Sequence, residues 1–356
     1  MRIACCLNGI VKIGGAERRL ARIFDALNNE NNQITFVLIK FDNNDEVLRT
    51  YKKYIKSEID IVLLRRRYST LYSYAKNAHF DVVCYIGPYR DMMPFLIGAK
   101  SGGSKCVWLL VNTFFANYMF DNLGQKILFN ITGKLSDRID CLYPSSIERI
   151  SEITRKPVSL TPCPFTDFTL FYPLHKTKTI VFLGRLVKGK NCDLFLYAIE
   201  RCKSKMLQYG YRAVVAGDGD EKESLELLSS TLGIDDIVEF KGYVQPEHVL
   251  PDASVYVSLQ DNNNYPSQAL IEAISCGCYI VATNVGDTNI IVKKEFGRLC
   301  AFDANEIAYA LSEYIDFSDD KKQILNNEAT QFARTTFSVD SSVKHYSKLF
   351  FELGEL

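Results

Sequence analysis

Short apolar runs alternate with amphipathic stretches along most of the chain. The clearest apolar runs predict buried strands at residues 1–7, 106–111, 179–183, 213–216 and 279–283. Apolar residues spaced three or four apart predict helices after several of these strands, and another near the end of the chain, at 338–351. Strands that alternate with helices are typical of an α/β fold built on parallel sheets.

A polar turn, a short helix, a strand and a second turn follow one another within residues 261–286. Pro266 suits the first position of a helix, and Gly277 is expected to end that helix. A helix N-terminus close to the glycine turn at 284–286 offers free N–H groups that can bind an anion. The Glu272 carboxylate is too far from that end to repel a phosphate, and could accept hydrogen bonds from a diol such as a ribose. An ordinary turn, helix and strand of an α/β sheet would show the same pattern.

Cations stand at another junction between a strand and a helix. The strand at 179–183 runs into Gly184 and Arg185, and Lys190 precedes the next amphipathic helix. Positive side chains at such a junction suit a diphosphate. The alternative is a solvated basic loop, which fits Arg185 less well because that residue follows a glycine and an apolar run.

These segments together resemble the GT-B-fold retaining glycosyltransferases of the group 1, family 4 type. The shared motifs are G-R-x-x-x-x-K-N at 184–191, a glycine turn at Gly217, F-x-G-x-V at 240–244 and the helical acid Glu272. A G-G-x-E motif at 14–17 also matches. The resemblance is strong over residues 179–300 and loose over 20–150. It implies an α/β protein with two Rossmann-like domains facing across a cleft, and transfer of a sugar from a nucleotide-sugar with retention of anomeric configuration.

The resemblance also implies the site residues. Arg185 and Lys190 would be catalytic, because they would hold the donor's diphosphate as it departs. The implied donor-binding residues are Gly14, Gly15, Gly184, Gly217, Val244, Asp261, Asn264, Ser267, Gln268, Ala269, Leu270 and Glu272. Asn112 is a weaker candidate on the acceptor side. No metal and no cofactor are expected, and a UDP-sugar is the favoured substrate.

Two departures from the family pattern leave other functions open. The family's E-x7-E motif has a first acid eight positions before Glu272, where this chain has Asn264; Asp261 is the nearest carboxylate upstream. Many relatives carry a histidine where this chain has Asn112, so no histidine base is expected. A nucleotide-sugar-binding subunit with weak or no catalysis therefore stays an alternative, as does an epimerase or phosphorylase on the same architecture.

Prolines mark the expected domain boundary. Three of them fall within residues 157–164 and another stands at 173, which predicts an extended connection. We expect an acceptor domain over 1–165 and a nucleotide-sugar domain over 166–335. The resemblance implies that a C-terminal helix within 336–356 crosses back to the first domain.

Charge is divided unevenly along the 356 residues, although the net charge is zero. Residues 1–160 hold 23 Lys and Arg against 15 Asp and Glu, whereas residues 161–356 hold 19 against 27. A helix expected at 47–56 has Leu48, Tyr51 and Ile55 on one side and basic residues on the other. Such a helix can lie on anionic lipid, although a solvated face would look the same. No recognition motif for nucleic acid accompanies the charge.

Cysteine usage and hydropathy predict the compartment. The eleven cysteines are an odd number without a C-x-x-C motif, which favours free thiols in a reducing cytosol. No apolar run reaches the length of about eighteen residues needed to span a membrane. We expect a cytoplasmic protein with peripheral contact to the inner face of the cytoplasmic membrane. By analogy with the family, it would build bacterial surface polysaccharide, such as O-antigen, capsule or lipopolysaccharide, on a glycan or lipid-linked acceptor.

Overall fold

The computed structural model describes the chain except for residues 9–14, 30, 40–43, 112, 264 and 355–356. The described chain forms two compact units. Unit 1 comprises Met1–Cys163 together with Val339–Leu356, and unit 2 comprises Pro164–Ser338. The predicted site residues Gly14, Asn112 and Asn264 lie outside the described residues.

Unit 1 is built on a seven-stranded parallel sheet with strand order β3-β2-β1-β4-β5-β6-β7. Its strands are β1 (Arg2–Asn8), β2 (Gln33–Ile39), β3 (Asp60–Leu64), β4 (Val82–Ile86), β5 (Lys105–Leu110), β6 (Arg138–Cys141) and β7 (Val158–Leu160). Its helices are α1 (Gly15–Leu27), α2 (Asn44–Lys52), α3 (Tyr68–Asn77), α4 (Met93–Ser101), α5 (Thr113–Ala116), α6 (Leu123–Leu135), α7 (Ile147–Thr154) and α14 (Val339–Gly354). The order runs outward from β1 in both directions, as in doubly wound Rossmann-like sheets.

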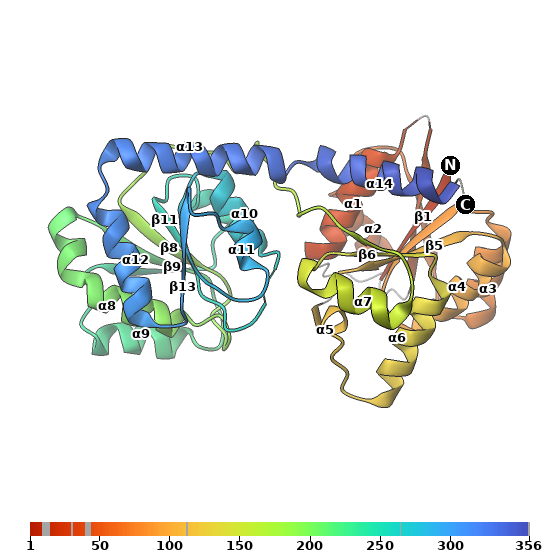
Figure 1. Cartoon of the computed structure of the whole chain (residues 1–356), viewed down its shortest axis with the longest axis horizontal. Coiled ribbons are helices and arrows are strands. Elements are labelled where there is room, and N and C mark those ends of the chain that lie inside the picture. Colours follow the sequence, from red (N-terminus) through yellow and green to blue (C-terminus); the bar gives the residue numbers. More distant parts are fainter. Residues whose placement is uncertain (9–14, 30, 40–43, 112, 264, 355–356) are drawn as a thin grey trace. The chain divides into compact units, whose positions relative to one another are not determined.

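Unit 2 is built on a six-stranded parallel sheet with strand order β10-β9-β8-β11-β12-β13. Its strands are β8 (Thr179–Leu183), β9 (Arg212–Ala216), β10 (Val238–Gly242), β11 (Val255–Ser258), β12 (Tyr279–Thr283) and β13 (Gly297–Cys300). Its helices are α8 (Cys192–Tyr209), α9 (Lys222–Thr231), α10 (Gln268–Ser275), α11 (Thr288–Ile291), α12 (Ala304–Asp316) and α13 (Asp319–Thr336), and they flank the sheet (Figure 1).

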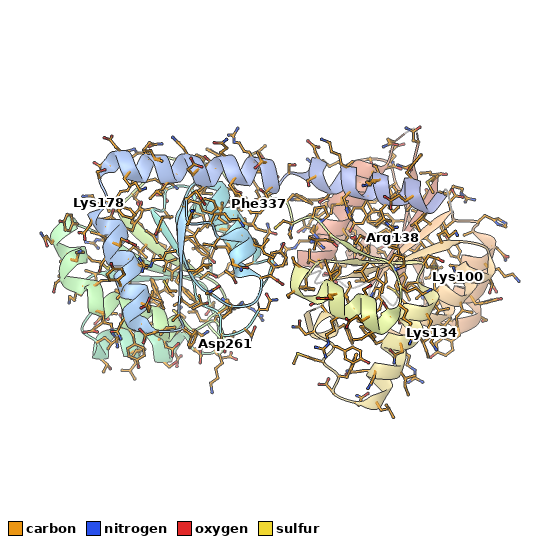
Figure 2. All side chains as sticks on the ribbon, in the orientation of Figure 1. Lys100, Lys134, Arg138, Lys178, Asp261 and Phe337 are labelled. Atoms are coloured by element: carbon orange, nitrogen blue, oxygen red, sulfur yellow. The ribbon has the colours of Figure 1, made fainter. Side chains whose placement is uncertain are left out.

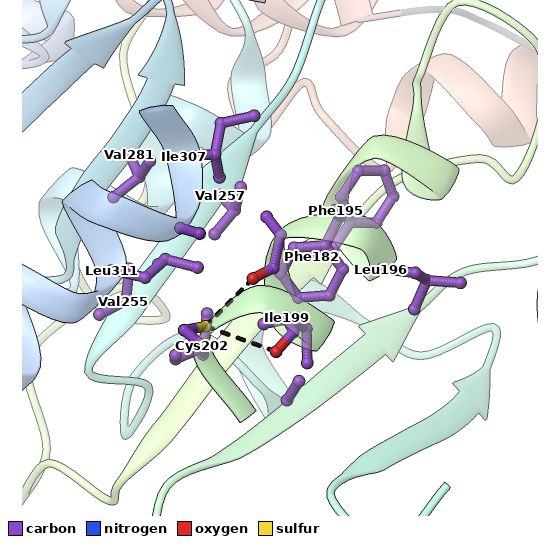
Figure 3. Close-up of a cluster of buried hydrophobic side chains, with 14 of the residues drawn as sticks. Phe182, Phe195, Leu196, Ile199, Cys202, Val255, Val257, Val281, Ile307 and Leu311 are labelled. Carbon is purple, nitrogen blue, oxygen red and sulfur yellow. Dashed lines mark hydrogen bonds between the residues drawn. The ribbon is translucent and has the colours of Figure 1, made fainter. Parts of the chain in front are cut away.

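Apolar side chains from two helices and the sheet form the core of unit 2. Phe195 and Ile199 of α8 and Ile307 of α12 pack against strand residues such as Phe182 and Val257, all buried (Figure 3). Burial of such aliphatic and aromatic area contributes about 25 cal/mol per Å². The core fixes the strands whose carboxyl ends carry the predicted site residues.

A buried polar cluster ties the C-terminal helix α14 to unit 1. Asp140 of β6 is fully buried, and its carboxylate accepts hydrogen bonds from Ser159 Oγ at 2.8 Å and Thr161 Oγ1 at 2.7 Å. His345 Nε2 of α14 lies 2.7 Å from the same carboxylate. Burial alone would raise the pKa of Asp140, but the bond and charge of His345, followed by the two hydroxyl donors, hold that pKa below its usual range.

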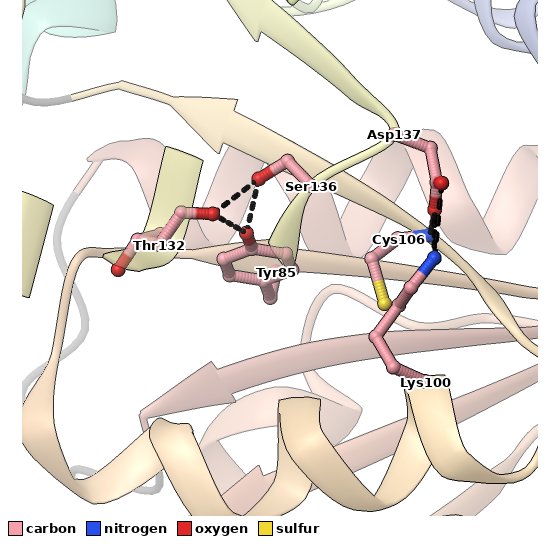
Figure 4. Close-up of polar contacts among 6 residues, drawn as sticks. All are labelled: Tyr85, Lys100, Cys106, Thr132, Ser136 and Asp137. Carbon is pink, nitrogen blue, oxygen red and sulfur yellow. Dashed lines mark hydrogen bonds and ion pairs between the residues drawn. The ribbon is translucent and has the colours of Figure 1, made fainter. Parts of the chain in front are cut away.

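A second polar group in unit 1 joins α4, β5 and the start of β6. Asp137 forms an ion pair with Lys100 at 2.8 Å and accepts a hydrogen bond from the backbone N–H of Cys106 at 2.7 Å (Figure 4). Nearby, the buried hydroxyl of Tyr85 lies 2.6 Å from Ser136 Oγ. These bonds satisfy polar groups that would otherwise be costly to bury.

The helix expected at 47–56 is shorter than the sequence predicts, because α2 ends at Lys52. The N–H groups of both Tyr54 and Ile55 turn back onto the carbonyl of Tyr51, and the Asp25 carboxylate then accepts the N–H of Lys56 at 3.0 Å. This competing acceptor holds the chain in a turn where an amphipathic helix was predicted.

Candidate functional site

The carboxyl ends of the parallel strands in unit 2 bring most predicted site residues to one edge of the sheet. Gly184 and Arg185 follow β8, Gly217 follows β9, Val244 follows β10, and Asp261 follows β11. Ligands of open α/β sheets bind outside such an edge. Residues that are distant in the sequence are therefore gathered where a single ligand can contact them.

Lys190 is half-buried at this edge, whereas Arg185 is exposed. Its Nζ donates a hydrogen bond to Gln260 Oε1, 3.0 Å away, beyond the end of β11. Partial burial lowers the pKa of Lys190, the positive charge of Arg185 lowers it further, and Asp261 opposes both effects. Arg185, Lys190 and Asp261 thus lie within electrostatic range of one another. An approaching anion would relieve the repulsion between the two cations.

The loop that carries Lys190 is fixed at its C-terminal end, where it meets α8. Asn191 precedes α8 in the left-handed conformation, with φ 56°, and its Nδ2 donates to the carbonyl of Leu259 at 3.2 Å. A Cβ added to Gly189 would lie 3.9 Å from Oδ1 of Asp261, so the loops after β8 and β11 are in contact. These contacts explain why Lys190 faces the sheet edge.

Gly217 is required by close packing between two turns. Its φ is +152°, and a Cβ there would lie 1.8 Å from the carbonyl oxygen of Gly184. Its N–H donates to the carbonyl of Gly242 at 2.7 Å, which ties the turn after β9 to the end of β10. A Cβ at Gly184, by contrast, would meet no atom within 4 Å. The backbone at Gly184 is therefore open to close approach by a ligand.

Helix α10 begins two residues later than the sequence suggests. Pro266 was expected at the first helical position, but Ser267 is the N-cap and Gln268 the first helical residue. The Ser267 side chain makes no capping bond. The N–H groups of the first turn have no acceptor within a helix, so those of Gln268, Ala269 and Leu270 are suitable donors to a phosphate.

Glu272 lies in the second turn of α10 and is only 9% exposed. Its carboxylate accepts a hydrogen bond from Gln268 Nε2 at 3.0 Å. Burial, and then the charge of Glu272, raise the pKa of the Tyr256 phenol in β11. The acid is therefore held in a fixed position beneath the loops of the edge.

Asn263 joins two of these loops and was not identified from the sequence. Its Oδ1 accepts the N–H of Tyr265 at 3.0 Å, and its Nδ2 donates to Asp287 at 3.1 Å. A Cβ at Gly286, where φ is +52°, would lie 2.2 Å from Cγ of Asn263. The glycine turn after β12 was the only signal in the sequence, and it did not indicate which residue packs against it.

A small hollow lies beside the start of α10. Its volume is about 10 Å³, and its lining includes Gln260, Ser267 and Thr283. Thr283 Oγ1 bridges the backbone of Gln260, donating to its carbonyl at 2.7 Å and accepting from its N–H at 2.8 Å. A cavity of this size holds about one water molecule.

The remaining predicted positions are less informative. Gly15 opens α1 in unit 1, and its donor-binding role stays a prediction. In the part of the chain that the structure describes, no three His, Cys, Asp or Glu side chains gather closely enough to hold a metal ion. Within the same part, no helix is long and apolar enough to span a membrane.

Two Rossmann-like parallel sheets, one of which carries a cationic and glycine-rich edge, are the architecture of the GT-B class. Residues 172–332 match the family described as glycosyl transferases group 1. The chain is 30% identical to a Campylobacter jejuni enzyme over 88% of its own length and 89% of that protein's length. That enzyme is named GalNAc-alpha-(1->4)-GalNAc-alpha-(1->3)-diNAcBac-PP-undecaprenol alpha-1,4-N-acetyl-D-galactosaminyltransferase. The chain therefore belongs to the group 1 glycosyltransferases.

Other similar proteins support the same assignment. The chain is 29% identical to a D-inositol 3-phosphate glycosyltransferase of Corynebacterium jeikeium, over 60% of this chain and 50% of that protein. Anabaena HepE, solved in complex with UDP, matches with a TM-score of 0.79 and 14% identity over 99% of both chains. Sucrose-phosphate synthase from Thermosynechococcus elongatus matches with a TM-score of 0.70 and 14% identity, over 100% of this chain and 99% of that one. The predicted GT-B fold class and family are confirmed.

Proposed function

We propose that this chain transfers a sugar from a UDP-sugar, with retention, to a glycan on a lipid carrier during assembly of a bacterial surface polysaccharide. The name of the Campylobacter jejuni relative describes a lipid-linked acceptor, an undecaprenol diphosphate glycan. HepE has been solved with UDP and with UDP-glucose. These likenesses favour uridine as the base and a lipid-linked acceptor.

The observation that carries the proposal is the pair of cations at the sheet edge of unit 2. Burial and the neighbouring Arg185 both disfavour the charged form of Lys190. Two neighbouring cations are stabilised most by an anion that neutralises both charges, and a diphosphate can do so. Guanidinium and ammonium groups are the usual phosphate ligands.

The proposed reaction exchanges one bond at the anomeric carbon for another. The bond from the anomeric carbon to the β-phosphate oxygen breaks, and the acceptor hydroxyl oxygen bonds to the same face of that carbon. The hydroxyl proton passes to the departing phosphate oxygen. Arg185, Lys190 and the first N–H groups of α10 would stabilise the growing negative charge, and a fixed donor of this kind contributes about 2.7–4 kcal/mol.

Glu272 is proposed to bind the donor's ribose hydroxyls. Its carboxylate accepts a hydrogen bond from Gln268 Nε2 at 3.0 Å, and a carboxylate is an acceptor group of the kind that ribose hydroxyls, as donors, can bind. Asp261, which lies near Lys190, is the candidate to contact the transferred sugar in place of the missing first acid. We further propose that transfer needs no metal ion, because two cations are available to neutralise the diphosphate.

Incubation of the protein with UDP-sugars and a lipid-linked glycan acceptor tests the function. UDP-N-acetylgalactosamine, UDP-N-acetylglucosamine and UDP-glucose are the donors to compare. We expect UDP release that depends on the acceptor, and a product whose anomeric configuration by NMR matches that of the donor. A product of opposite configuration would refute retention. UDP binding without turnover of any donor would favour the binding-subunit alternative, and donor isomerisation would favour the epimerase.

A further inference from the structure

Helix α6 of unit 1 exposes a row of aliphatic side chains. Leu123 is 71% exposed, Ile127 49% and Ile131 44%. Because these residues are four positions apart, they lie along one face of the helix. We call them the α6 stripe. Met119, in the turn that leads to α6, is also 55% exposed. Among the described residues, no other helix exposes three aliphatic side chains.

The opposite face of α6 already fixes the helix to unit 1. Phe129 and Thr132 are fully buried, and the Phe129 ring packs edge-on against Trp108 of β5 at 4.9 Å. Asn122 caps the helix by accepting the N–H of Gln125 at 3.0 Å. The α6 stripe therefore takes no part in the packing that holds the helix, and an exposed apolar row of this kind marks an interaction surface.

Basic side chains accompany the α6 stripe. Lys126 and Arg149 both lie over the ring of Tyr118, at 5.8 and 5.3 Å from its centroid, beside the start of the helix. Lys134 is exposed in the last turn (Figure 2). The neighbouring acid, Asp121, accepts a hydrogen bond from Gln125 Nε2 at 3.2 Å. An apolar row bordered by cations and an aromatic ring matches the boundary between anionic headgroups and acyl chains.

The basic segment at 47–56, which the sequence favoured for membrane contact, is a poorer candidate. Val47 and Tyr51 of α2 are fully buried, and Ile55 is 8% exposed. Most apolar residues of that segment are therefore engaged within unit 1, although Leu48 and Tyr54 are half-buried. Charge alone gives weak binding that salt screens.

We propose that the α6 stripe, with Lys126 and Lys134, lies on the surface of an anionic lipid bilayer. The aliphatic side chains enter the headgroup region, and the two ammonium groups contact lipid phosphates. The contact would hold unit 1 at the level where a lipid-linked acceptor displays its sugars. The inference does not require the proposed function, because binding to vesicles involves neither donor nor acceptor.

Co-sedimentation with vesicles tests the proposal. Wild-type protein is compared on phosphatidylcholine vesicles and on phosphatidylcholine–phosphatidylglycerol vesicles, at low and at physiological salt. We expect binding to the mixed vesicles, and a loss of about tenfold or more in the triple variant Leu123→Gln/Ile127→Gln/Ile131→Gln. Glutamine favours helices and leaves the charge unchanged. Leu227→Gln in α9 of unit 2, where the leucine is 69% exposed, is the matched control and should bind like wild type.

A second variant separates the electrostatic contribution. Lys126→Gln/Lys134→Gln should reduce binding to the mixed vesicles by about fivefold for each charge, mostly at low salt. The proposal would be overturned if wild-type protein did not bind the mixed vesicles, or if the triple variant bound them like wild type. If the triple variant instead abolishes self-association seen by analytical ultracentrifugation, the stripe joins two copies of the chain and the membrane proposal is wrong. UDP binding by the triple variant should equal that of wild type. Failure of the membrane proposal would therefore not bear on the proposed donor site.

Discussion

Replacing Lys190 by glutamine tests the electrostatic reasoning about the sheet edge. Burial and Arg185 both disfavour the ammonium in the free protein, so removing its charge should cost little folding stability. Glutamine also keeps an N–H donor for Gln260, the present acceptor of the Lys190 bond. UDP binding should nevertheless fall sharply, because a hydrogen bond to a charged group contributes about 1.5–3 kcal/mol. That loss corresponds to a rise of about 10- to 150-fold in the dissociation constant.

Isothermal titration calorimetry with UDP measures this change. Lys188→Gln is the matched control, because Lys188 is exposed in the same loop and has no assigned contact with the diphosphate. We expect the control to bind UDP almost like wild type, apart from a small salt-dependent decrease. Equal losses in both variants would mean that general positive charge attracts UDP. Unchanged affinity in Lys190→Gln would refute the assignment of Lys190.

The pH dependence of UDP binding gives an independent check on the same residue. Because the pKa of free Lys190 is lowered, first by burial and then by Arg185, a bound diphosphate should raise it. UDP affinity is then full below the pKa of the free protein and declines as the pH rises through that value. Calorimetry in buffers of different ionisation enthalpy should show proton uptake in this range, and Lys190→Gln should abolish the uptake.

The remaining predictions concern the nucleoside, the backbone, the interior of unit 1 and metal ions. Glu272→Gln should weaken UDP binding while leaving the affinity for inorganic pyrophosphate unchanged; equal weakening of both ligands would contradict a ribose contact. Gly217→Ala should destabilise the protein by about 1–3 kcal/mol in urea denaturation, because its Cβ would overlap the Gly184 carbonyl. Gly184→Ala should keep the folding stability of wild type but bind UDP more weakly. Equal folding stability of the two variants would refute the packing argument. Asp140→Ala should cost about 3–5 kcal/mol, because it leaves His345 and two hydroxyls without their buried acceptor. Because the pKa of Asp140 is lowered on folding, its contribution to folding stability is present above the unfolded-state pKa near 3.8 and is lost as the pH falls through the folded-state pKa. An Asp140→Ala variant whose stability fell with pH as steeply as that of wild type would contradict this. Transfer activity should survive EDTA, and loss on chelation with recovery on adding manganese would show that a metal is needed.

Local patterns in the sequence predicted several strands of unit 2 at their observed positions, whereas the GT-B fold was inferred from the resemblance in motifs. The apolar runs at 179–183 and 279–283 coincide with β8 and β12. Strands and amphipathic helices depend on neighbouring residues, so their periodicity is visible directly. The helix start at Gln268 was misplaced because Ser267 and Pro266 are both good residues for a helix terminus.

Contacts between distant segments could not be predicted in this way. The bond between Asp140 and His345 joins residues 205 positions apart, and the fit of Asn263 against Gly286 depends on how two loops are brought together. The α6 stripe was also missed, because a sequence cannot show which apolar face of a helix a sheet leaves uncovered. Even so, the resemblance in motifs directed attention to Arg185, Lys190 and Glu272, which the structure places on one edge of unit 2.

Hydrogen–deuterium exchange with and without UDP tests the central claim most directly, since it reports on every backbone segment at once. The account predicts slower exchange in the loops after β8, β9, β10 and β11 and in the first turn of α10, with little change along α8, α9 and α13. The same experiment on Arg185→Ala should show the protection greatly reduced at the same UDP concentration. Protection confined to other segments, or no protection at saturating UDP, would contradict the assignment of this edge as the site of the nucleotide-sugar.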